Sequence, residues 1–454
     1  MSASAIALNR FGLGARPDEA APADPRGWLL SQLERYEPLP APWKHLARTP
    51  ALLDVWLAQQ RAVRQAPEGE RSGIREAYLR QAREHYLAAV GARAASSLQA
   101  QAPFAERLVH FWSNHFAVSV DKLLVVGLAG AFEADAIRPH VLGRFEDLLL
   151  AAVRHPAMLL YLDQAQSIGP RSAAARRAEE RQQRQRGLNE NLAREILELH
   201  TLGVRSGYTQ EDVTEFAHAL TGWTLPGEDR GADTAATFRF VPALHEPGGR
   251  TVLGRRYAEG GEQQARAILH DLATAPATAR HVASKLARHF VADQPPPELV
   301  QRLADTFSRT EGDLPSVYRE LVAAPQAWQP VQSKFKSPWE WALSAQRAMG
   351  RRDLAPAEAA ALMNQLGQPV WRPGSPAGYD DLAATWAAPD ALLRRVEVAQ
   401  RIAQQGGDAI DARSLAPRLL PGVLSEATAG AIARAESGST ALALLLVAPE
   451  FLRR

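Results

Sequence analysis

The stretch "GLNENLAREILELHTLGV" (187–204) decides the fold class of this chain. Its apolar residues recur at intervals of three and four, which is the spacing of one face of an α-helix. The apolar stripe consists of Leu192, Ile196 and Leu199. Gly203 follows the stripe, at a place where glycine commonly ends a helix. The pattern predicts a helix over 189–202 that buries one face, and it is typical of a mainly α protein.

The same helix carries polar residues that the apolar stripe does not explain. Asn191, Glu195 and Glu198 share a second strip at positions i, i+4 and i+7. Two carboxylates at i and i+3 can share a divalent cation, or divide into a general acid and a general base. The structural alternative is that they pair with arginines elsewhere. His200 lies at the edge of the apolar stripe, either as a hydrogen-bonded core histidine or as a metal ligand.

The segment "RLVHFWSNHF" (107–116) holds a second group of polar residues on an expected helix. His110 and Asn114 share one face of this helix, whereas His115 lies on its apolar stripe. Such side chains are either hydrogen-bonded parts of a core or the acids, bases and ligands of a site. Both interpretations stay open at this point.

The two segments together define a candidate site if the helix over 104–116 packs on the helix over 189–202. The predicted catalytic residues are Glu195, Glu198, Asn191, His110 and Asn114. The predicted metal ligands are Glu195, Glu198, His115 and His200. With Cys 0 in the sequence, a metal must be held by imidazole, carboxylate, amide or water. A divalent cation is therefore the cofactor that this set of residues would hold.

The rest of the chain extends the mainly α prediction. Most segments have helical periodicity with short Pro/Gly breaks, and we expect one small β-hairpin near 237–254, with "PGGR" as its turn. The Arg-rich segment 171–186 is expected to be a flexible basic loop. The body is either one large helical domain over 1–454 or two lobes, divided into 1–225 and 226–454.

Composition excludes several classes of protein. Lys+Arg 52 against Asp+Glu 50 gives a net charge of +2, without the basic excess of a dedicated nucleic-acid binder. The longest apolar runs are too short to span a membrane. The N-terminal segment lacks the pattern of a secretory signal, so the sequence predicts a cytoplasmic protein. Metalloprotease, phosphate-loop, hydrolase-elbow and dinucleotide-binding motifs are also absent.

Several motifs resemble the bacterial family known as domain of unknown function 1800, over almost the whole chain. They include "FWSNHF" (111–116), "IRPHVLGRFEDLLLAAVRHPAMLLYLD" (137–163), "GLNENLAREILELHTLGVRSGYTQEDVTEFAHALTGWT" (187–224) and "VASKLARHFVADQPP" (282–296). The resemblance implies no established activity. It does imply a co-encoded partner, a phosphatase/sulfatase-like secreted protein of the family known as domain of unknown function 1501. Export to the periplasm together with that partner is the alternative to a cytoplasmic location.

Two functions follow from these observations. The first is an enzyme with a metal-assisted or general acid/base site built from Glu and His on two helices. The second is a non-catalytic binding protein or chaperone for the co-encoded partner. The second function predicts an exposed aromatic surface near Trp371 and Tyr379, whereas the first predicts a cleft into which polar groups converge.

Overall fold

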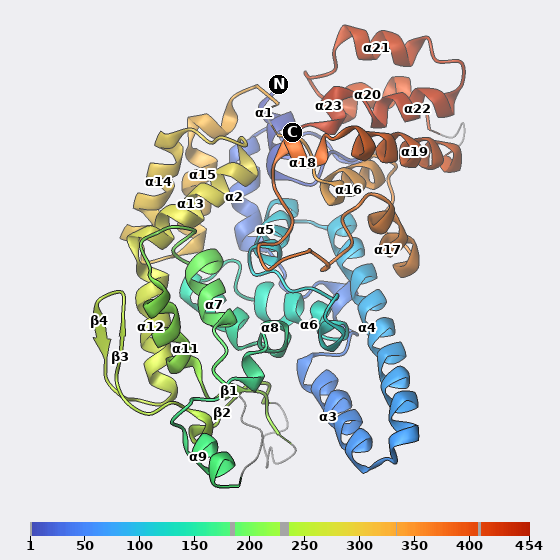
Figure 1. Ribbon diagram of the computed structural model, residues 1–454. Helices are drawn as coiled ribbons and strands as arrows, with labels where there is room; N and C mark the ends of the chain where they lie inside the picture. The colour runs from blue at the N-terminus through green and yellow to red at the C-terminus, as the bar shows by residue number, and fades with distance from the viewer. Residues whose placement is uncertain (1, 182–186, 228–235, 333, 407–409) are drawn as a thin grey trace.

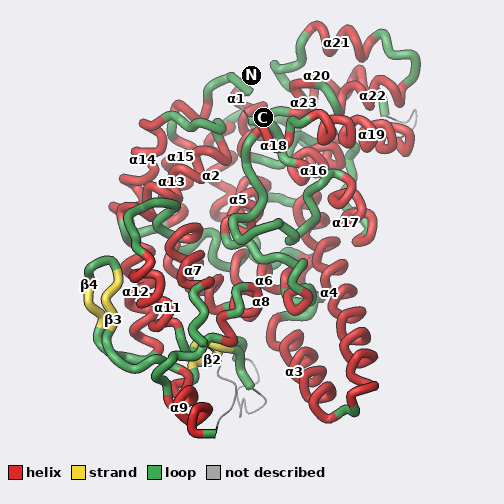
Figure 2. Tube along the Cα trace, viewed as in Figure 1, coloured by secondary structure: helices red, strands yellow, loops and turns green. Residues whose placement is uncertain are grey.

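The computed structural model describes residues 2–181, 187–227, 236–332, 334–406 and 410–454. Helices make up most of these residues, and the strands form two small antiparallel pairs (Figure 1, Figure 2). The predicted mainly α fold with a small hairpin is therefore confirmed. Among the described helices, none has both the length and the apolar character that crossing a bilayer requires.

The helices of the first half of the chain begin with short α1 and include the long pair α3 and α4, which extends away from the body in Figure 1. Prolines occupy the first turn of several helices, where the missing N–H costs no hydrogen bond. The helices are α1 (Ala3–Ile6), α2 (Pro25–Arg35), α3 (Thr49–Gln65), α4 (Arg71–Gln99), α5 (Pro103–His115), α6 (Ala129–Phe132), α7 (Phe145–Arg154), α8 (Pro156–Tyr161), α9 (Ala173–Glu180), α10 (Asn191–Glu195) and α11 (Gln210–Leu220).

The helices of the second half include an outlying group, α19 to α23, drawn in red in Figure 1. They are α12 (Glu262–Thr274), α13 (Pro276–Phe290), α14 (Pro297–Arg309), α15 (Leu314–Ala323), α16 (Pro338–Ala348), α17 (Pro356–Gln365), α18 (Ala383–Trp386), α19 (Pro389–Gly406), α20 (Ala412–Leu419), α21 (Glu426–Ala433), α22 (Gly438–Leu446) and α23 (Pro449–Leu452). One hydrophobic cluster runs from Ile6 to Phe451 and so includes side chains from both halves of the chain.

The helix predicted over 189–202 is present, in two parts. α10 continues directly into a π-helical turn, Ile196–His200. Gly203 follows with φ +96°, a left-handed conformation that glycine adopts without steric cost. Such π-helical turns are rare and occur frequently at functional sites.

The β-hairpin forms with a different turn from the predicted one. β3 (Arg250–Val252) pairs with β4 (Arg255–Tyr257), and the residues between them, Leu253 and Gly254, both have positive φ. Two-residue turns of this kind match the twist of a hairpin. The predicted "PGGR" turn is therefore wrong, since this segment leads into β3. The second pair consists of β1 (Trp223–Thr224) and β2 (Arg239–Phe240).

The Arg-rich segment 171–186 is partly helical. α9 begins after Ser172, whose side chain accepts a hydrogen bond from the backbone N–H of Ala175 and so caps the helix. The prediction of a flexible loop therefore does not describe Ala173–Glu180, while residues 182–186 lie outside the described residues.

Candidate active site

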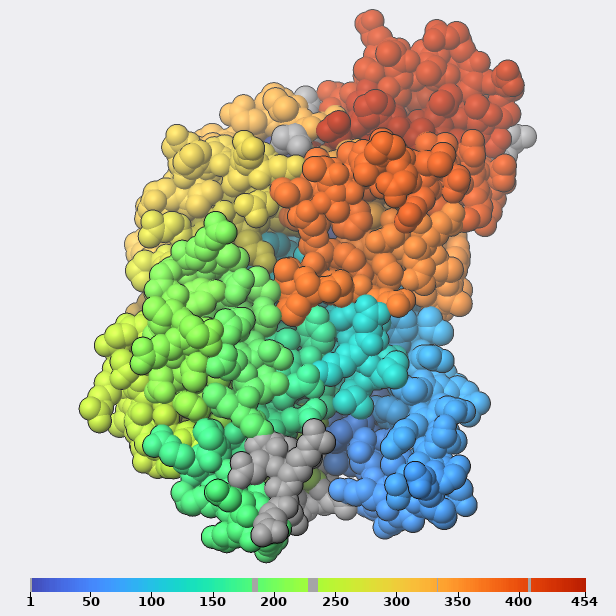
Figure 3. Space-filling model, viewed as in Figure 1, coloured from blue at the N-terminus to red at the C-terminus, as the bar shows by residue number. Residues whose placement is uncertain are grey.

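A cavity of about 450 Å³ opens between α5, α13, the start of α16 and the loop 366–381. The space-filling view shows it as a hollow between yellow-green and orange elements, with teal atoms at its floor (Figure 3). The loop crosses α5 and is held there by Asn114, whose amide nitrogen donates to the carbonyl of Tyr379 at 2.8 Å. The amide oxygen of Asn114 accepts from the backbone N–H of Tyr379 at 2.7 Å. Asn114 thus positions the loop that closes the cavity.

Helix α13 supplies the basic side of the cavity. Its apolar residues pack inward on one face, and the opposite face carries basic side chains at i, i+4, i+7 and i+8. These cavity-lining residues are His281, Lys285, Arg288 and His289. Within the described residues, neither Lys285 nor Arg288 forms a hydrogen bond or an ion pair. Burial lowers the pKa of Lys285 to about 8; Asp381 opposes this shift and Arg288 adds to it.

His289 is held by a carboxylate. Its Nδ1 lies 2.9 Å from Oδ2 of Asp381, and its Nε2 has no hydrogen-bond partner among the described residues. Lys334 approaches the same carboxylate, with 3.3 Å between Nζ and Oδ1. Burial lowers the pKa of His289, and Asp381 opposes that shift. The ring is therefore neutral near pH 7, with the proton on Nδ1, and its buried Nε2 lies 3.9 Å from Oε1 of Glu340.

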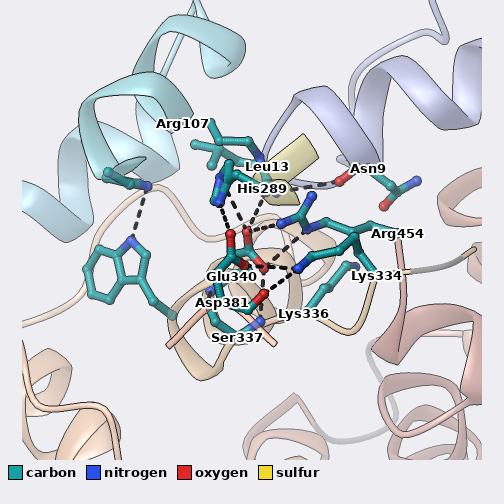
Figure 4. A network of polar contacts seen from close by, with 12 residues as sticks. Asn9, Leu13, Arg107, His289, Lys334, Lys336, Ser337, Glu340, Asp381 and Arg454 are labelled. Carbon is teal, nitrogen blue, oxygen red and sulfur yellow. Dashed lines mark hydrogen bonds and ion pairs between the residues drawn. The ribbon is translucent and has the colours of Figure 1, made fainter. Parts of the chain in front are cut away.

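Glu340 is the centre of a buried ionic network beside the cavity (Figure 4). Its carboxylate pairs with Arg107 and lies 2.9 Å from Nη2 of Arg454. It also accepts the backbone N–H of Ser337 at 2.9 Å, which caps α16. Burial alone would raise the pKa of Glu340, but Arg454 and Arg107 outweigh it and hold the pKa well below its usual range. Glu340 is therefore ionised and fully engaged.

Two indole rings and the guanidinium of Arg93 line another part of the cavity. The guanidinium of Arg93 lies between two indole rings, 4.7 Å from the ring centre of Trp339 and 5.4 Å from that of Trp371. Its Nε lies 2.9 Å from Glu133, which also accepts the indole N–H of Trp371 at 3.1 Å. Cation–π stacking of this kind holds all three side chains in place.

His110 lines the cavity, but its ring nitrogens are both occupied. Nε2 lies 3.1 Å from the hydroxyl of Ser97, and Nδ1 accepts the indole N–H of Trp339 at 3.3 Å. Burial and the nearby Arg93 lower its pKa well below the ordinary value. These contacts are typical of a neutral structural histidine, so the catalytic role predicted for His110 stays a prediction.

The helices predicted to pack together do meet, at His115 and His200. The ring centres are 6.2 Å apart, and Nε2 of His115 donates to the carbonyl of His200 at 3.1 Å. Both side chains are almost fully buried. Within the described residues, Nδ1 of His115 and both ring nitrogens of His200 have no hydrogen-bond partner. The expectation of a hydrogen-bonded imidazole at His200 is therefore wrong.

The acidic strip of the motif helix lies elsewhere. Asn191 is exposed, and Glu195 and Glu198 are partly exposed outside the cavity. Tyr208 donates to Glu198 at 3.0 Å. Burial and the neighbouring Glu198 raise the pKa of Glu195. The structure thus does not bring these carboxylates into the cavity that His110, Asn114 and His115 line.

The described residues contain no group of three or more His, Asp or Glu side chains arranged to hold a metal ion. The ligand set Glu195, Glu198, His115 and His200 therefore gains no support from the side-chain geometry, and it stays a prediction.

Sequence reasoning missed the basic face of α13. The segment "HVASKLARHF" (281–290) contains the necessary signal, because its four basic residues fall on one helix face without any acidic residue. Asp381 offered no comparable signal, since only the folded chain brings it to His289.

The fold and the cavity define a mainly α protein with a basic, imidazole-lined site. Residues 6–453 match the family described as Protein of unknown function (DUF1800), and the chain belongs to that family. The resemblance seen in the sequence is thereby confirmed. No curated protein and no solved structure matches the chain.

Replacement of His200 by phenylalanine is expected to stabilise the protein, most strongly in acid. Burial lowers the pKa of His200 to about 3, against about 6.5 when unfolded. Between these values the unfolded state binds more protons, so stability is present above pH 6.5 and is lost as pH falls toward 3. His200→Phe removes this loss of stability in acid. It also removes the unpaired ring nitrogens, and a buried polar group without a hydrogen bond costs about 1–3 kcal/mol of stability. The melting temperature should rise at pH 7.5 and rise more at pH 5.

The control is His45→Phe, since His45 is exposed and should leave the pH dependence of the melting temperature unchanged. A lower melting temperature of His200→Phe at both pH values would mean that the imidazole makes a stabilising contact.

Proposed function

We propose that the cavity is the active site of an enzyme that acts on a small anionic molecule, with Lys285 and Arg288 binding the anionic group. The observation that carries this proposal is a pair of cations on one face of α13 that form no hydrogen bond or ion pair with any other described residue. A cavity of about 450 Å³ has the size of a small-molecule site. A partly desolvated cation without a partner is unfavourable, and a carboxylate or phosphate would supply that partner.

Three carboxylates among the described residues line the cavity, and all are engaged. Asp380 accepts hydrogen bonds from the backbone N–H of Asp381 and the hydroxyl of Thr385. Glu340 is paired with Arg107 and Arg454, and Asp381 with His289 and Lys334. Among the described residues, Lys285 and Arg288 therefore form no ion pair, although the charge of Asp381 acts on Lys285, and their positive charge is available to a ligand. The positive charge of this part of the cavity contrasts with the near-neutral net charge of the whole chain.

Proton transfer is assigned to His289. The carboxylate of Asp381 fixes the tautomer, and Nε2, which lies 3.9 Å from Oε1 of Glu340, is the nitrogen that would accept a proton as a general base near neutral pH. His289 lines the cavity on the same helix face as Lys285 and Arg288. This assignment moves the acid/base role from Glu195 and Glu198 to α13.

The alternative function, binding of a co-encoded partner, has less support. It predicted an exposed aromatic surface, but Trp371 is only 5% exposed, and its indole N–H is bonded to Glu133. The phosphatase/sulfatase-like partner, the cytoplasmic location and export with the partner all stay predictions.

Anion binding can be measured as the rise in melting temperature that inorganic phosphate produces at low ionic strength. We expect a saturable rise for the wild-type protein. The double variant Lys285→Met/Arg288→Met should lose it, because the phosphate then has no cation to pair with. In a turnover screen of carboxylate and phosphate esters, His289→Asn should lower kcat about 10²–10⁴-fold while the phosphate shift is retained.

Arg280→Met is the matched control, since it removes a positive charge from the same helix at an exposed position outside the cavity. An equal phosphate shift in the double variant and in Arg280→Met would overturn the proposal.

A further inference from the structure

The chain uses lysine sparingly, with five lysines among its 52 basic residues. Arginine stays protonated in proteins, whereas a lysine amine can lose its proton and then act as a nucleophile. A lysine inside the cavity can therefore act as a nucleophile, which the many arginines of this chain cannot do.

The other four lysines have structural contacts, either an ion pair at 2.6 to 2.8 Å or, for the buried Lys336, an aromatic ring 4.5 Å away. The contacts are Lys44 with Glu37, Lys122 with Asp163, Lys334 with Asp293, and Lys336 over the ring of Phe451. Lys285 has no such contact within the described residues, and it lines the cavity. Among the described residues, the amine of Lys285 lines the cavity and forms no hydrogen bond or ion pair.

The surroundings of Lys285 favour the neutral amine. Burial and a neighbouring positive charge both disfavour protonation, and together they bring its pKa to about 8 against the opposing charge of Asp381. The groups that face it come from four elements: His281 and Arg288 on α13, His115 on α5, His200 on the π-helical turn and Asp381 on the loop. A substantial fraction of the amine is therefore unprotonated near pH 8.

We propose that the amine of Lys285 forms an imine with the carbonyl group of a 2-oxo acid, whose carboxylate Arg288 binds. This inference rests on the proposed function for the anionic group and adds a covalent step. Arg288 lies at i+3 from Lys285 on the same helix face, so both side chains can reach one small ligand. A 2-oxo acid has its carboxylate directly beside its carbonyl, which fits such close neighbours.

The step balances without an oxidant or a reductant. The lone pair of the neutral amine attacks the carbonyl carbon, a C–N bond forms, and the carbonyl π electrons move to oxygen. Proton transfer from nitrogen to oxygen gives a carbinolamine. Loss of its hydroxyl as water then gives the C=N bond of the imine.

The test is trapping with pyruvate and sodium borohydride, carried out on the full-length protein at pH 8. Borohydride reduces the imine to a stable secondary amine, which peptide mass spectrometry locates. We expect near-stoichiometric modification of Lys285 and little at the other four lysines. Lys285→Arg keeps the positive charge and should show no adduct in the cavity, whereas Lys122→Arg should be labelled at Lys285 like the wild type. Absence of an adduct at Lys285, or equal labelling of Lys122, would overturn the inference.

The phosphate shift in melting temperature separates this inference from the proposed function. Lys285→Arg should retain most of the shift, because arginine also pairs with phosphate. If the wild-type protein shows the phosphate shift but no adduct, the anion site is supported and the imine is contradicted. If the wild-type protein shows no phosphate shift, the proposed function is contradicted, whatever the result of the trapping experiment.

Discussion

Glu340→Gln is expected to lower the free energy of unfolding by about 3–5 kcal/mol, since it removes one partner of a buried ion pair. Arg107 and Arg454 would then keep their buried charges without the carboxylate that compensates them. Both arginine side chains are almost completely buried, so water cannot replace the carboxylate. The amide of glutamine can still accept the hydrogen bond from Ser337, so the change isolates the charge. Chemical unfolding monitored by tryptophan fluorescence measures the effect.

Glu358→Gln is the control, because the ion pair of Glu358 with Arg351 has side chains 40% and 37% exposed. Exposed pairs contribute about 0–1 kcal/mol, and the unfolding midpoint should move little. If the two variants shifted the midpoint equally, the buried network around Glu340 would contribute no more to the free energy of unfolding than an exposed ion pair does.

Gly378→Ala is expected to detach the loop 366–381 from α5 and to abolish the phosphate shift in melting temperature. Gly378 has φ +82°, and an added Cβ would collide with the backbone carbonyl of Asn114 and lie 2.8 Å from its side-chain oxygen. A left-handed conformation and a backbone clash together cost about 1–3 kcal/mol or more. The loop forms one wall of the cavity, so its displacement removes the enclosure on which anion binding depends.

Gly374→Ala tests whether any alanine in the loop has this effect. An added Cβ at Gly374 meets nothing within 4 Å, and its backbone does not need a positive φ. This variant should keep both the phosphate shift and the melting temperature. Retention of the phosphate shift in Gly378→Ala would show that the loop tolerates the clash and that its position does not control the cavity.

Helical periodicity allowed much of the fold to be predicted, because spacing along the chain is a local property. It placed the helix around Ile196, although that helix ends at His200 and not at residue 202, and it put His110 and Asn114 on a common face, which indeed lines the cavity. It also showed that Glu195 and Glu198 share a strip. It did not show what that strip faces.

The composition of the cavity could not be predicted in this way, since it depends on contacts between distant segments. His289 and Asp381 are 92 residues apart in the chain, and Asn114 and Tyr379 are 265 apart. The sequence reveals that α13 is amphipathic, but a basic helix face is equally typical of a solvent-exposed surface. Only the folded arrangement shows that this face lines a cavity.

The engagement of Arg454 has a consequence for how the protein folds during synthesis. Arg454 pairs with Glu340, and its backbone N–H donates to the carbonyl of Lys334 at 2.9 Å. Ribosomes add about 5–20 residues per second, so Glu340 emerges several seconds before the arginine that completes its network. During that interval Arg107 can compensate the carboxylate, but Arg454 cannot. The wall of the cavity next to Glu340 therefore reaches its final form only after Arg454 has left the ribosome.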